Sequence, residues 1–301
     1  MNDNMCRRLF LVRSNFPDEL DKDKNYQFKD KLFESDCDNN CKTDIDKIKA
    51  GCLFWFNELF GSSSSFRNHA NSNMNVVAYI WAWLSYKLNQ KPQNEINTLN
   101  DFYNMYIENS EKYKTSIENV EEYNTYIELI NKNKDLLNIN FKDMSNFYNA
   151  FILLCDISNG LGTNSSCDHH LEKAKEFAKK YDELNENYNN TKDSPYNQVL
   201  STLSNDYNNF KKRCNKFPTL PTYSRRSVIK KALISISFTF VAVSIFLGIA
   251  YKVNNKEFKN IIFKKYFCDC LYANIRKIIH FLTFYISIRY LDFGNGLKNN
   301  I

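Results

Sequence analysis

The chain has 301 residues and a formal net charge of +6, which is long enough for one sizeable domain or two small ones. The charge excess lies entirely at the end: residues 1–231 carry 31 basic and 31 acidic side chains, whereas residues 252–301 carry 9 and 3. A nucleic-acid-binding domain would have a basic face on its folded part, so this distribution argues against nucleic acid as a partner and favours contact between the tail and anionic lipid.

The first 16 residues carry charges where a secretory signal peptide would have its apolar core, so we do not expect a signal peptide there. Over residues 1–215, apolar side chains recur at helical spacing almost throughout, and no segment alternates as a strand would. Thr43 is the expected N-cap of one helix. The apolar stripe of this helix contains Ile45, Ile48, Cys52, Phe56 and Leu59. A second apolar stripe, on the next expected helix, contains Val76, Val77, Ile80, Trp81, Leu84 and Leu88.

Further helices are expected near 96–115, 119–133, 141–157, 167–189 and 195–214. Residues 1–215 are therefore predicted to form one helical ectodomain. The side chains expected in its core are Ile48, Leu53, Phe56, Ile80, Trp81, Leu84, Phe147, Phe151 and Leu154.

Seven cysteines precede the apolar segment, and they are the candidates for disulfide bonds: Cys6, Cys37, Cys41, Cys52, Cys155, Cys167 and Cys214. In an oxidising compartment they would form up to three disulfides and leave one cysteine over, with a connectivity that the sequence does not fix. The competing interpretation is a zinc site, with ligands drawn from Cys37, Cys41, Cys167, His169 and His170. We favour disulfides, because no second closely spaced cysteine pair exists before the apolar segment, and we interpret both histidines as solvated residues at a helix start.

Residues 216–231 form a proline-containing linker with a basic flank, and residues 232–251 are 20 consecutive uncharged, mostly apolar residues. At about 1.5 Å per residue, such a helix covers the ~30 Å hydrocarbon core of a bilayer. We therefore predict a single transmembrane helix over 232–251, which would also serve as the targeting signal; a buried core helix is the alternative. Basic residues are nearly equal in number on its two sides, so orientation is suggested only by the cysteines, which favour an extracytoplasmic N-terminal part.

Residues 252–301 form a basic tail that contains a second apolar stretch, 278–291. This stretch is short for a span, so we predict an interfacial helix on the membrane surface, with a second span as the alternative. Cys268 and Cys270 lie between the two apolar segments and are candidates for palmitoylation.

Sequence patterns of catalysis are absent: the chain has no glycine-rich phosphate loop, no GxSxG and no HExxH, and it has only four histidines. We therefore expect no enzymatic activity, no cofactor, no bound metal and no small-molecule substrate.

The chain resembles the Plasmodium interspersed repeat (PIR) proteins, close to the rodent-malaria yir/bir/cir branch. The resemblance rests on an ordered series of words over about residues 1–252, among them VRSNFPDEL (12–20), YIWAWLSYKLN (79–89), FYNAFILLC (147–155), FAKKYDELN (177–185), FPTLP (217–221) and IFLGIAYK (245–252). The tail after residue 252 departs from the family pattern, because it is longer than the short basic segment usual there.

The resemblance implies a variant antigen of the blood stage, held in an infected red-cell or parasite membrane, with roles in immune evasion and host-cell interaction. Its partners would be the lipid bilayer and a host protein or antibody. The alternative is an internal membrane or trafficking protein whose helical domain binds a protein partner. Since loops tolerate variation and carry recognition, we expect antibody and ligand contacts at the polar segments Asp18 to Lys42, Gly61 to Asn73 and Asn159 to Ser166.

Overall fold

The computed structural model of the chain describes residues 3–66, 76–92, 95–120, 124–162, 166–221 and 224, together with positions 273, 276, 277 and 280. The chain divides into two compact units, Met1–Thr222 and Tyr223–Ile301. The first unit contains nearly all of the described residues and every element discussed below.

The described part of the first unit is helical, and its only β-type pairing is an isolated bridge between Leu20 and Tyr26. The prediction of an all-α domain is confirmed for these residues. The elements in chain order are α1 (Asp3–Asn15), α2 (Asp30–Phe33), the 3-10 helix η1 (Asn39–Cys41), α3 (Asp44–Phe60), α4 (Ser63–Phe66), α5 (Val76–Gln90), α6 (Leu99–Phe102), the π turn η3 (Tyr103–Ile107), α7 (Glu111–Lys114), α8 (Tyr126–Lys132), the 3-10 helix η4 (Lys134–Asn138), α9 (Phe141–Gly162), the 3-10 helix η5 (Cys167–His170), α10 (Leu171–Asn185) and α11 (Pro195–Arg213).

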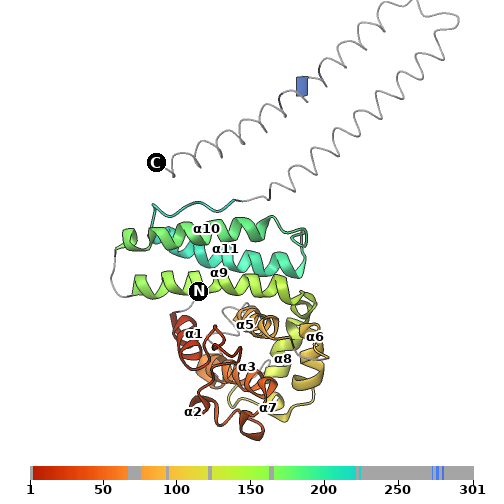
Figure 1. Ribbon diagram of the computed structural model, residues 1–301. Coiled ribbons are helices and arrows are strands. Elements are labelled where there is room, and N and C mark those ends of the chain that lie inside the picture. Colours follow the sequence, from red (N-terminus) through yellow and green to blue (C-terminus); the bar gives the residue numbers. More distant parts are fainter. Residues whose placement is uncertain are drawn as a thin grey trace, which may run out of the picture. The chain divides into compact units, whose positions relative to one another are not determined.

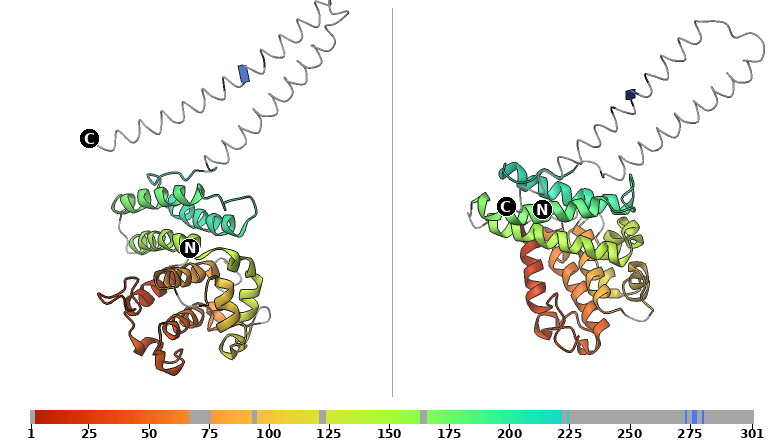
Figure 2. Two further views of the ribbon diagram at one scale, coloured as in Figure 1. Left: turned by 45° about the vertical axis from the view of Figure 1, so that its right-hand side comes forward. Right: turned by 45° about the horizontal axis from the view of Figure 1, so that its top comes forward.

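Helix α9 is the centre of the unit. On one side it packs against α5 and α1, and on the other it packs against α10 and α11 (Figure 1). The turned views in Figure 2 show the same order, with α9 between the α10–α11 pair and the N-terminal helices. Because α9 contacts both groups, its apolar residues form one continuous core with those of its neighbours.

All nine residues predicted for the core are buried, with exposed fractions between 0 and 5%. Tyr79 of α5 illustrates how the core crosses the layers. Its ring stacks on Phe151 of α9 at 4.2 Å between centroids, and its hydroxyl donates a 2.6 Å hydrogen bond to Asp206 of α11. Burial of the aromatic rings and pairing of this hydroxyl therefore join α5, α9 and α11.

The segment after α1 is anchored to the core by polar groups of α5 and α9. The ammonium of Lys87 on α5 donates to the carbonyl of Pro17, and the hydroxyl of Tyr148 on α9 donates to Asp18 at 2.7 Å. Asp18 also pairs with Arg13 of α1. Burial lowers the pKa of Lys87 to about 8. Residues 12–20 and 79–89, two of the segments that carry the family resemblance, are thus in contact with each other, and these contacts stabilise the fold.

Three of the expected helices differ from those observed. The expected helix 96–115 is divided, because a π turn over Tyr103–Ile107 separates α6 from α7. The expected helix 119–133 begins only at α8, where the Thr125 hydroxyl accepts from the backbone N–H of Glu128. The expected helix 167–189 is a 3-10 turn followed by α10, which ends at Asn185.

The prediction of a helix capped by Thr43 is confirmed: its hydroxyl accepts from the Asp46 N–H, and the Asp46 carboxylate accepts from the Thr43 N–H. No individual helix was predicted over residues 3–15, although Cys6, Leu9 and Val12 recur at helical spacing and are all buried in α1.

Within the described ranges, no helix combines the length and the apolar character that crossing a bilayer requires. The expected span 232–251 and the basic flank 225–231 lie outside the described residues, as does most of the tail 252–301, including nearly all of the stretch 278–291.

Candidate functional site

Six of the seven cysteines in residues 1–215 form three disulfides. Cys6 of α1 bonds to Cys155 of α9, Cys37 bonds to Cys41, and Cys167 bonds to Cys214. The bonds close segments with sequence separations of 149, 4 and 47 residues. The first ties α1 to the central helix, the second closes a small loop before α3, and the third ties the start of the α10 region to the end of α11.

Cys52 is the seventh cysteine and takes no part in a disulfide. It is fully buried in α3, and burial raises the pKa of its thiol to about 12, opposed by a hydrogen bond with Tyr113. A thiol with so high a pKa is a poor nucleophile at neutral pH. Cys52 therefore belongs to the core, as its place on the apolar stripe indicated.

The zinc alternative is wrong for the residues that the structure describes. Cys37, Cys41 and Cys167 are all in disulfides and offer no thiolate to a metal. No group of three or more His, Cys, Asp or Glu side chains within the described part of the chain is arranged to hold a metal ion. His169 is exposed, as predicted, whereas His170 packs closely on Gly160, where an added Cβ would lie 1.8 Å from the imidazole ring.

The palmitoylation candidates, Cys268 and Cys270, lie outside the described residues.

A surface hollow of about 650 Å³ lies beside the Cys37–Cys41 loop. We call it the α3–α7 hollow, because its walls come from the ends of these helices and their neighbouring segments. Two of the three segments predicted to carry recognition meet here, since Ser35 and Asp36 belong to 18–42 and Gly61, Ser62 and Ser63 belong to 61–73. The remaining lining residues are Leu53, Asn57, Lys112, Thr115, Ser116, Ile117, Glu118, Asn119 and Tyr126.

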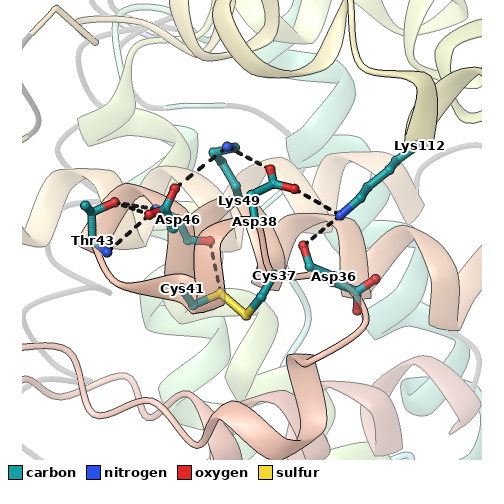
Figure 3. Close-up of polar contacts among 8 residues, drawn as sticks. All are labelled: Asp36, Cys37, Asp38, Cys41, Thr43, Asp46, Lys49 and Lys112. Carbon is teal, nitrogen blue, oxygen red and sulfur yellow. Dashed lines mark hydrogen bonds and ion pairs between the residues drawn. A yellow bond between two sulfur atoms is a disulfide. The ribbon is translucent and has the colours of Figure 1, made fainter.

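The Cys37–Cys41 loop is held in place by ion pairs across the hollow's edge (Figure 3). Asp38 lies inside this loop and accepts from Lys49 of α3 at 2.9 Å and from Lys112 of α7 at 3.1 Å. Asn40 and Cys41 both adopt left-handed backbone conformations, with φ of 57° and 50°. Non-glycine residues rarely adopt such conformations unless surrounding contacts require them. The disulfide and the two lysines supply contacts of this kind.

A hydrogen-bonded chain runs along one wall of the hollow. The Tyr126 hydroxyl donates to the Asn57 amide oxygen at 2.9 Å, and the Asn57 amide nitrogen donates to the Asp36 carboxylate at 2.7 Å. Lys112 donates to the backbone carbonyl of Asp36 at 3.3 Å, which joins this chain to the Cys37–Cys41 loop. The wall is therefore preorganised by α3, α7 and α8.

The two carboxylates nearest the loop differ in their electrostatics. Burial raises the pKa of Asp36, although Lys112 and the Asn57 hydrogen bond act in the opposite direction. Hydrogen bonds and charge attraction from Lys49 and Lys112 hold the pKa of Asp38 below its usual value. Asp38 is thus a carboxylate at the edge of the hollow that is paired with two lysines. Asp36 is 5% exposed, and its hydrogen bonds and the nearby Lys112 do not fully offset the cost of burying its charge.

In the third predicted recognition segment, the described residues, 159–162 and 166, do not line the α3–α7 hollow. Its first four residues continue α9 to Gly162, and residues 163–165 lie outside the described part. The wall formed by Lys112 and by Thr115 to Asn119 was not predicted. Residues 116–118 fall between the two expected helices, and the polar run of Thr115, Ser116, Glu118 and Asn119 around Ile117 is typical of a loop.

A second hollow, of about 400 Å³, lies beside Tyr188 at the turn between α10 and α11. Here the buried carboxylate of Asp143 accepts hydrogen bonds from the side-chain amides of Asn140, Asn187 and Asn189 at 2.6–2.8 Å. These amides are engaged with the protein itself, so they fasten the turn to the start of α9.

The chain matches the family model "Plasmodium variant antigen protein Cir/Yir/Bir" over residues 6–252. It is similar to a solved structure described as "Structure of a Plasmodium PIR protein ectodomain", with 32% identity and a TM-score of 0.58 over 74% of this chain and 97% of that chain. No curated protein matches the sequence.

Proposed function

Because the chain belongs to the Plasmodium Cir/Yir/Bir family of variant antigens, we propose that it is a membrane-anchored surface antigen of the blood stage, acting in immune evasion and contact with host cells. In this proposal the helices are a constant scaffold, and the segments around the α3–α7 hollow present the variable surface. The lipid bilayer and a host protein or antibody are the partners.

The observation that carries the proposal is the set of three disulfides in one unit. Disulfides of this kind persist in oxidising compartments and are rare where glutathione keeps thiols reduced. The Cys6–Cys155 pair is wholly buried, with both residues 0% exposed, so it is a structural bond. This pattern favours an extracytoplasmic ectodomain over the alternative of a domain that faces the cytosol.

The test combines protease treatment of intact infected cells with differential thiol labelling. We expect external protease to remove the ectodomain epitope, and we expect Cys6, Cys155, Cys167 and Cys214 to react with a maleimide only after reduction. Cys52 is the internal control, because it should label upon denaturation without any reductant. If these four paired cysteines label without reductant in denatured cell extracts and the epitope survives external protease, the protein faces the cytosol and the internal trafficking role is the better account.

A further inference from the structure

We propose that the α3–α7 hollow binds a basic side chain, most favourably arginine, that projects from a protein partner. The inference rests on the proposed function, since it names the chemistry of the partner at that same surface. Three properties of the hollow carry it: the balance of charge on its lining, the state of the Asp36 carboxylate and the composition of its walls.

The lining has an excess of negative charge. Among the residues that the structure describes, it contains two carboxylates, Asp36 and Glu118, and one ammonium, Lys112. That ammonium is already engaged by Asp38 at 3.1 Å and by the Asp36 carbonyl. Residues 1–231 as a whole carry equal numbers of acidic and basic side chains, so the excess is a local property. A cationic group is the complementary occupant.

The Asp36 carboxylate is the specific anchor. It is 5% exposed and accepts hydrogen bonds from Asn57 and from the Ser35 side chain, yet it also lines an open hollow. An ionised carboxylate can accept about four hydrogen bonds, and burial without full compensation disfavours its charged form. A guanidinium would donate paired N–H hydrogen bonds to this carboxylate and would replace the interactions with water that burial has removed.

The walls suit a protein loop that carries such a side chain. The hydroxyls of Ser63 and Ser116 can bond the backbone of an incoming loop, and Leu53 and Ile117 supply apolar contact. The hydroxyls of Ser62 and Thr115 already donate to Ser65 and to the Glu111 carbonyl, so they can act only as acceptors. A volume of about 650 Å³ exceeds one guanidinium and its stem, so part of the partner's chain enters with it. A charged group enclosed by polar and apolar walls is a common arrangement for an interface hot spot, where arginine is enriched.

The direct test is calorimetric titration of the full chain, in detergent micelles, with three acetylated and amidated tripeptides, Gly-Arg-Gly, Gly-citrulline-Gly and Gly-phosphoserine-Gly. Citrulline has nearly the shape of arginine but no charge. We expect the arginine peptide to bind at least about tenfold more tightly than the citrulline peptide, because the charge and the paired donors are what the hollow recognises.

Three variants locate the binding. Asp36→Asn keeps the acceptor for Asn57 but removes the charge, and it should weaken arginine-peptide binding by about tenfold or more. Glu118 is exposed, so Glu118→Gln should leave the fold unchanged. This variant should weaken arginine-peptide binding by about two- to threefold. Asp23→Asn is the matched control: it removes one charge from the same 18–42 segment outside the hollow, and it should leave binding unchanged.

Equal binding of the arginine and citrulline peptides would overturn the inference, as would wild-type affinity in both Asp36→Asn and Glu118→Gln. Tightest binding of the phosphoserine peptide would show instead that Lys112 governs the hollow. These outcomes are separate from those of the proposed function. A protein that faces the cytosol would still bind arginine here, and a surface antigen that binds no arginine peptide would keep its localisation and lose only this site.

Discussion

The helical core around α9 and the rim of the α3–α7 hollow differ in how their positions are fixed. In the core, buried rings and a wholly buried disulfide fix α1, α5 and α9, and few alternatives of the same size would fit. At the rim, a five-residue disulfide loop and two lysines fix the backbone, while the side chains that line the hollow are largely hydroxyls and amides. The first region tolerates little change in sequence, and the second can vary without loss of the fold.

The disulfides give the largest contrast between the two regions. Cys6→Ala with Cys155→Ala opens a segment of 149 residues, and the chain-entropy model gives a loss of about 5 kcal/mol in the free energy of unfolding. Cys37→Ala with Cys41→Ala opens a segment of only four residues, for which the same model gives about 2 kcal/mol. Denaturant unfolding of both double variants in detergent measures the difference. A larger loss for the Cys37–Cys41 variant would reverse the assignment of scaffold and rim.

Trp81 tests the core through packing alone. It lies on α5 with no exposed surface, so Trp81→Ala should lower the free energy of unfolding by about 3 to 5 kcal/mol. Met105 is 45% exposed, and Met105→Ala should cost less than about 0.5 kcal/mol. A loss of under about 1 kcal/mol at Trp81 would contradict its place in the core.

Lys87 gives a smaller effect with a defined pH dependence. Its pKa is lowered to about 8 in the folded protein, so between about pH 8 and 10.5 the unfolded chain binds more protons at this residue, and stability rises with pH. Relative to Lys87→Met, the wild type should therefore gain about 1.5 kcal/mol between pH 8 and 9.5.

The comparison with Lys87→Met is needed because the Cys52 thiol acts in the opposite direction. Its folded pKa is about 12, so the unfolded chain loses that proton first and stability falls above about pH 9. Arg13 and Asp18 are the charged groups of the packed elements that act electrostatically on Lys87. Parallel pH profiles for the two proteins would show that Lys87 is not a desolvated lysine.

The core could be predicted from the sequence because a local pattern determines it. Apolar residues at three-and-four spacing face inward on any helix that packs against others, and the nine named residues are all buried. The broken helices could have been predicted in part. Thr98 and Thr125 each cap a helix that begins at the next residue, and the carboxylate residue three positions after each marks that start.

The α3–α7 hollow could be predicted only in part. Two of its walls were expected to carry recognition because they are polar and lie between helices. The contact of these walls with residues 112–119 depends on how α3, α7 and α8 pack. Asp36 and Lys112 are 76 positions apart in the chain, and no local sequence pattern predicts a contact over that distance. The same holds for the pairing of Cys6 with Cys155, since seven cysteines alone leave many connectivities open.

Exchange of loops between two variants of the family tests the central claim most directly. On the full chain, residues 18–42 and 61–66 would be replaced together by those of a second variant, and residues 159–166 would be replaced separately as the control that leaves the hollow untouched. Binding of variant-specific antibodies, and of the arginine peptide, would be measured on each chimera. The account predicts that both follow the first exchange and that peptide binding is unchanged by the second. If antibody specificity stayed with the helical framework after the first exchange, recognition would lie on the helices and the account would be wrong.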